Sequence, residues 1–167
     1  MTTSCQSNLK ELMVLLEKIN EEQYTRHLKL LSGATLGQHI RHILEFYLSV
    51  MKGIDCGTVN YDSRERDPDL EKNTRYGIQV IGKIIHWLNG INENRLISLR
   101  GNFSADDWIE LDIESSLNRE LAYCYEHSIH HQALIKIGLN ELGLQFLIDD
   151  NFGVAPATIR YKSTCAQ

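Results

Sequence analysis

Two histidines, His127 and His131, are four residues apart in a segment with helical periodicity. Residues at this spacing lie on one face of an α-helix, with Cβ atoms about 6 Å apart. Both imidazoles can therefore bind one cation, at roughly 2.0–2.1 Å if the ion is zinc. The neighbouring His130 lies off this face. Residue 128 is serine where the H-E-x-x-H motif has glutamate, so metalloprotease chemistry is not supported.

A second group of histidines, His39 and His42, lies in another helical segment. The two are within about 60° of one another around a helix, so either can face the first pair. Helical bundles build metal sites from side chains on facing helices, which favours one shared site. Histidines at helical spacing also occur by chance as surface or core groups, and that interpretation stays open at this point.

Four amphipathic segments must position these histidines. Apolar residues recur in each at spacings of three and four, which is typical of helices with one buried face. The expected helices cover about residues 6–30, 35–51, 68–91 and 116–142. Thr35 and Ser115 or Ser116 are suitable N-caps, Asp67-Pro68 is typical of a helix start, and Gly143 of a helix end.

The segments between these helices are longer than simple bundle connections require. A polar loop runs from residue 52 to 67, and residues 96–100 and 108–111 are either short strands or extended connectors. The tail from Phe146 is expected to be irregular. We therefore expect an all-α protein, a four-helix bundle with long crossover connections, as a single domain over residues 1–167.

Composition and charge exclude some functions. The net charge of −5 disfavours nucleic-acid binding, because such proteins usually present a basic face to phosphates. No apolar run is long enough to cross a bilayer, so no membrane partner is expected. The first residues lack the basic and apolar regions of a signal peptide. The four cysteines form no C-x-x-C pair, and a cytoplasmic location is expected.

Both histidine motifs resemble those of a known family. Thr35-Leu36-Gly37-Gln38-His39-Ile40-Arg41-His42-Ile43 is similar to the second-helix motif of the DinB/YfiT-like superfamily. Glu126-His127-Ser128-Ile129-His130-His131 is similar to its late H-x-x-H-H motif. Residues 59–62 and 152–156 resemble an uncharacterised bacterial branch. The resemblance implies a four-helix bundle, often a homodimer, that binds zinc or nickel through His42, His127 and His131, with His39 as the rival to His42.

A metal ion with three protein ligands keeps an open position, which distinguishes a working site from a closed structural one. The resemblance favours a thiol there, because several relatives look like transferases that use low-molecular-weight thiols. We therefore expect a metal-dependent thiol transferase acting on a small electrophile. The alternatives are a metal-dependent hydrolase and a non-enzymatic, stress-related metal-binding module.

Further residues are candidates for supporting roles. Glu45 and Glu120 are suitable hydrogen-bond acceptors for the ligand imidazoles, although solvated carboxylates are the more common interpretation. Cys124 is either a small core residue or a fourth, soft ligand. The loop residues Tyr61, Asp62 and Arg64 are candidates for the substrate pocket, although a loop with both charge signs is also typical of solvated surface.

Overall fold

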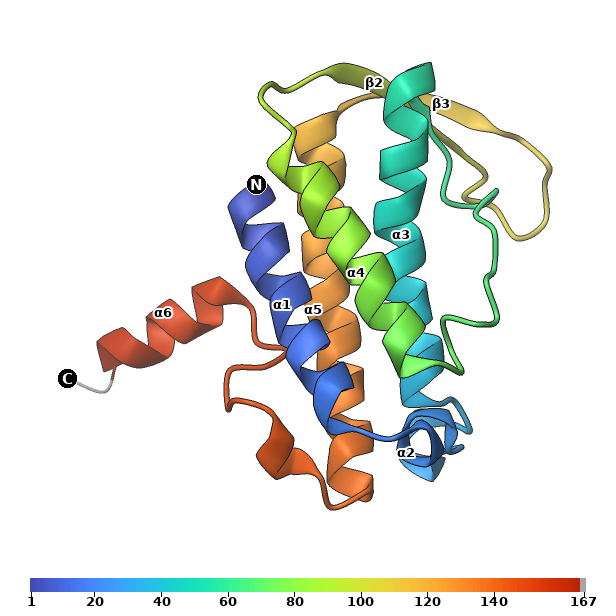
Figure 1. The fold of residues 1–167 in the computed structure, drawn as a ribbon. Helices are drawn as coiled ribbons and strands as arrows, with labels where there is room; N and C mark the ends of the chain where they lie inside the picture. The colour runs from blue at the N-terminus through green and yellow to red at the C-terminus, as the bar shows by residue number, and fades with distance from the viewer. Residues whose placement is uncertain (166–167) are drawn as a thin grey trace.

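The computed structural model describes residues 1–165, with side chains to residue 164. Six α-helices, two short 3₁₀-helices and three strands follow one another along this part of the chain (Figure 1). The helices are α1 (Thr2–Lys18), α2 (Glu21–Thr25), η1 (Lys29–Leu31), α3 (Leu36–Cys56), α4 (Thr74–Asn89), α5 (Leu117–Glu141), η2 (Gln145–Leu147) and α6 (Pro156–Cys165). The strands are β1 (Thr58–Val59), β2 (Leu96–Gly101) and β3 (Leu111–Ser116).

The four longest helices, α1, α3, α4 and α5, lie side by side around one apolar core (Figure 1). Each presents a face of buried aliphatic residues to the others, such as Leu12 of α1, Ile40 of α3, Ile81 of α4 and Leu121 of α5. Burial of these faces is the main driving force for the fold. None of the helices in the described residues is long and apolar enough to cross a membrane.

The strands form one mixed sheet at one end of the helices, in the order β1-β2-β3 (Figure 1). β1 pairs in parallel with β2, and β2 pairs antiparallel with β3. Ile97 and Leu99 of β2 are buried on alternate positions, as expected of a half-buried strand. The expectation of an all-α four-helix bundle is therefore wrong: the structure has six α-helices and a sheet, because the crossover between α4 and α5 pairs as a hairpin.

Several expected helix boundaries are also wrong. The segment 6–30 is not one helix: Ile19 is extended (φ −101°, ψ 148°), and Asn20 caps α2 in a capping box with Gln23. Asp67 does not start a helix. Its carboxylate accepts hydrogen bonds from the Asp69 amide and the Tyr76 hydroxyl, both at 2.9 Å, and α4 begins seven residues later at Thr74. The tail is not entirely irregular, since it contains α6.

Candidate metal centre

Three imidazoles from two helices meet between α3 and α5. His42 of α3 and His127 and His131 of α5 each offer a nitrogen, and these atoms all lie within 4.8 Å of one another. The Nε2 atoms of His42 and His127 are 2.8 Å apart, and the ring of His131 lies 4.5 Å from that of His42 and 4.6 Å from that of His127. No fourth histidine, cysteine or carboxylate of the described side chains belongs to this group.

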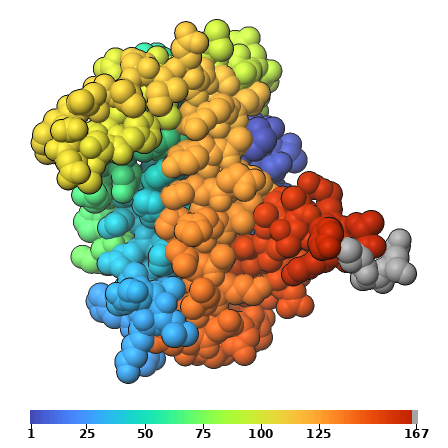
Figure 2. Space-filling model, turned by 180° about the vertical axis from the view of Figure 1, so that it is seen from behind, coloured from blue at the N-terminus to red at the C-terminus, as the bar shows by residue number. Residues whose placement is uncertain are grey.

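The interiors of two long helices position the ligands. α3 and α5 pack along much of their length and lie next to each other in the turned view of Figure 2. Gly138 of α5, two turns after His131, leaves room for leucine side chains at and before the start of α3. A Cβ atom at this position would lie 2.7 Å from Leu36 Cδ2 and 2.9 Å from Leu31 Cδ1. A larger residue would therefore displace the ends of these leucine side chains.

The environment keeps the three imidazoles neutral. Burial, followed by the charge of neighbouring histidines, lowers the pKa of His42 to about 4 and that of His131 to about 3. Burial, His130 and Arg64 lower the pKa of His127. A neutral imidazole has a lone pair free for a cation, whereas a protonated one has none. The group is therefore in the protonation state that a metal ion needs at neutral pH.

The separation of the His42 and His127 nitrogens is close to that of two ligands of one ion. Two ligands at about 2.05 Å from a tetrahedral zinc are roughly 3.3 Å apart, and at a right angle the distance falls to about 2.9 Å. The His42 and His127 nitrogens are 2.8 Å apart, so the two rings need to separate by only a few tenths of an ångström. This displacement is within the reach of side-chain rotation, without a change of backbone.

Aromatic rings support one side of the group. The Phe46 ring stacks on His127, with centroids 4.4 Å apart, and also on Tyr61, at 4.7 Å. The exposed Tyr123 lies 5.7 Å from His127. Sequence reasoning missed Phe46 and Tyr123. Their spacing was a usable signal, because each is four residues from a ligand, His42 or His127, and therefore on the same helix face.

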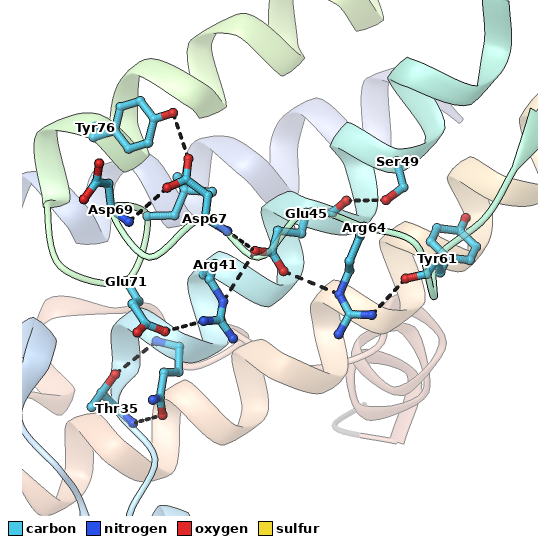
Figure 3. Close-up of polar contacts among 12 residues, drawn as sticks. Thr35, Arg41, Glu45, Ser49, Tyr61, Arg64, Asp67, Asp69, Glu71 and Tyr76 are labelled. Carbon is cyan, nitrogen blue, oxygen red and sulfur yellow. Dashed lines mark hydrogen bonds and ion pairs between the residues drawn. The ribbon is translucent and has the colours of Figure 1, made fainter. Parts of the chain in front are cut away.

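Glu45, a candidate acceptor for the imidazoles, binds other partners. Its carboxylate is 2% exposed and lies 3.5 Å from Arg41 Nε and 3.4 Å from Arg64 Nε (Figure 3). It also accepts a hydrogen bond of 2.9 Å from the Asp67 amide. Arg41 in turn donates to Glu71. Glu45 therefore fixes the 60–73 segment on α3, and it forms no hydrogen bond with a histidine.

Glu120, the other candidate acceptor, is fully buried. It accepts hydrogen bonds from the Tyr61 hydroxyl at 2.7 Å, from Arg119 at 2.8 Å and from Ser115. Cys124 lies beside this group, with its Sγ 3.8 Å from the Tyr61 hydroxyl, and burial raises the pKa of its thiol. Neither Glu120 nor Cys124 is brought together with the three histidines.

The three residues expected to line the substrate pocket do not all lie near the histidines. Tyr61 belongs to the aromatic stack, and the Arg64 guanidinium lies 5.6 Å from the centre of the Phe46 ring, so both are close to the histidines. Asp62 is not: its carboxylate accepts a hydrogen bond of 2.8 Å from the amide of Asn102, beyond β2. His39 contacts His131 but lies outside the group of three.

Two cavities lie elsewhere, along α3 and α4. Their volumes are about 850 and 560 Å³, and both are lined by Met51, Asp55, Lys83 and Trp87. Neither is lined by a histidine of the candidate centre. The histidines themselves are half-buried.

Comparisons with known proteins correct the expected family. No family model matches the chain, and no solved structure does. A curated relative from Rhizopus delemar, named FK506-binding protein 5, is 38% identical over 109 residues. The chain spans 27% of that relative, and the match covers 62% of the chain. The expected membership of the DinB/YfiT-like superfamily is therefore wrong, and the homodimer that it implied loses its support.

Proposed function

We propose that the chain binds one divalent metal ion, zinc or nickel, through His42, His127 and His131, and uses it to activate a small thiol. The observation that carries the proposal is the convergence of three neutral imidazoles from two helices, with nitrogens within 4.8 Å of one another. Imidazole is a common ligand of both metals. Three protein ligands are typical of catalytic zinc sites, whereas structural sites usually have four.

When bound, the ion would lower the pKa of a thiol at the remaining coordination position, so that the thiol reacts at neutral pH. The residues of the chain hold and shield this position. Phe46 fixes the plane of the His127 ring by stacking, and Tyr123 is also stacked with this ring, at a longer distance. Arg64 lies beside Phe46, and its charge is paired with the Glu45 carboxylate.

The disposition of the carboxylates favours thiol activation over hydrolysis. A hydrolase commonly uses a carboxylate near the metal as a general base. Here Glu45 is occupied by two arginines, and Glu120 by Tyr61, Ser115 and Arg119. A thiol depends less on such a base, because its pKa of about 8.5 is far below the pKa of water.

Metal content tests the binding site. Chain loaded with zinc or nickel and freed of excess ion is expected to hold one ion, measured by elemental analysis. His42→Ala, His127→Ala and His131→Ala should each lose it. His130→Ala is the matched control, because His130 is exposed and lies outside the group. Full metal content in a His127→Ala/His131→Ala double variant would refute the site.

Cobalt substitution tests the chemistry. Addition of a small thiol to cobalt-loaded protein should produce a sulfur-to-cobalt charge-transfer band, which the metal-free protein lacks. A parallel screen of esters and amides without thiol would reveal a hydrolase. A spectrum that neither thiols nor hydrolase substrates change, with four protein ligands by X-ray absorption, would instead indicate a structural metal.

A further inference from the structure

A fourth histidine lies directly behind the candidate centre. The Nδ1 atom of His39 is 3.0 Å from the Nδ1 atom of His131, and the ring centroids are 5.2 Å apart. His39 is one turn before His42 on α3. The two helices therefore meet through two histidine pairs, His39 with His131 and His42 with His127.

The contact decides which nitrogen of His131 faces a cation. A neutral imidazole has one protonated nitrogen and one with a free lone pair. Nδ1 of His131 is directed at His39, which is outside the group of three, so Nε2 is the nitrogen left to join His42 and His127. For Nε2 to bind an ion, the proton must be on Nδ1, where His39 accepts it.

Stability alone does not explain a histidine at position 39. Its Nε2 atom is buried without a hydrogen-bond partner among the described residues. A buried polar atom without a partner costs stability, and an apolar ring of similar size would avoid that cost. What the imidazole contributes is its Nδ1 contact with His131.

We propose that His39 is a positioning residue, which accepts the outer N–H of His131 and thereby orients His131 toward the metal ion. This inference rests on the proposed metal site. Outer hydrogen bonds of this kind fix the ring and increase the basicity of the ligand, and their loss typically weakens metal binding about 10–100-fold.

Three variants test the role. His39→Phe removes the acceptor and keeps a flat ring, whereas His39→Asn keeps an acceptor near the position of Nδ1. His130→Phe is the matched control, because the exposed His130 adjoins His131 in the chain but forms no hydrogen bond with it. Zinc affinity is measured by competition with a chromophoric chelator, and the melting temperature is measured without metal.

We expect His39→Phe to bind zinc about 10–100-fold more weakly than the wild type, with an unchanged or higher melting temperature. His39→Asn should recover most of the affinity, and His130→Phe should match the wild type. In the zinc-loaded wild type, ¹⁵N NMR should show a proton on His131 Nδ1 and a scalar coupling across the hydrogen bond to His39 Nδ1.

The outcomes separate the two proposals. Wild-type zinc binding that His39→Phe leaves unchanged would overturn the role of His39 and leave the metal site intact. A His131 protonated on Nε2 in the zinc-loaded protein would do the same. A wild-type chain that binds no metal would overturn the metal site itself, and the role of His39 with it.

Discussion

Replacement of Tyr61 by Phe tests whether the buried carboxylate of Glu120 depends on one hydroxyl. The hydroxyl donates a hydrogen bond of 2.7 Å to Oε2 of Glu120, while Ser115 and Arg119 donate hydrogen bonds to Oε1. Oε2 has no other hydrogen-bond donor among the described residues. Tyr61→Phe keeps the ring that stacks on Phe46 and deletes this donor, together with the 3.8 Å contact of the hydroxyl with Cys124 Sγ.

The magnitude follows from the full burial of Glu120. A hydrogen bond to a charged group contributes about 1.5–3 kcal/mol, and an unsatisfied buried oxygen cannot recover it from water. We therefore expect Tyr61→Phe to lower the free energy of unfolding by about 2–3 kcal/mol. For a chain of this size, that corresponds to a decrease of roughly 4–12 °C in melting temperature.

Urea denaturation of Tyr61→Phe, Glu120→Gln and the double variant measures the loss and its origin. In the double variant the two losses should not add, because either change removes the same charged hydrogen bond. A Tyr61→Phe protein within about 0.5 kcal/mol of the wild type would refute this account of Glu120, because changes of that size are typical of surface positions.

Further predictions concern pH and close packing. Because the pKa values of the ligand histidines are lowered, zinc affinity should fall less than about threefold from pH 7.5 to 6.0. Three imidazoles of ordinary pKa would lose roughly fiftyfold in zinc affinity over the same range. Competition with a chelator at both pH values distinguishes the two cases. Since the pKa of His42 is lowered to about 4 in the folded protein, the unfolded chain binds more protons between pH 6.5 and 4. The metal-free protein should therefore lose stability as pH falls through that window. His42→Asn should reduce this dependence in urea titrations, while His131, whose pKa is lowered to about 3, still contributes to it. Gly37→Ala should cost about 1–3 kcal/mol in the same assay, because its Cβ would lie 2.8 Å from the Glu71 carbonyl carbon. Gly82→Ala, with nothing within 4 Å, should instead stabilise α4 by about 0.5–1 kcal/mol.

The local sequence predicts the end of a helix correctly where a capping residue defines that end. Thr35 and Ser116 cap α3 and α5 as expected, and Gly143 follows α5 with a φ of 70°. The first helix was predicted too long because apolar periodicity continues beyond it. Tyr24 and Leu28 are fully or almost fully buried at helical spacing, although they belong to α2 and a loop. Apolar periodicity indicates which residues are buried and not where a helix ends. Here one core buries residues of α1, of α2 and of the loop that follows.

The histidines of the centre were identifiable from their spacing, but their surroundings were not. Glu45 is three residues from His42, yet it pairs with Arg64 because the 60–73 segment folds back over α3. A strand was an open alternative at residues 96–100, where β2 lies, but β1 was not expected, for a similar reason. β1 has only two residues and pairs with β2, about forty positions away, so no local pattern indicates it.

The glycine at position 138 has a consequence for how the surroundings of the proposed metal site can change in evolution. It touches no ligand, yet its missing side chain lets α5 lie against Leu36 at the start of the helix that carries His42. The packing of leucine side chains between α5 and the start of α3 is therefore set by the size of this residue. For the metal site proposed above, exchanges of small and large residues in this layer would alter the packing near the ligands while every histidine stays unchanged.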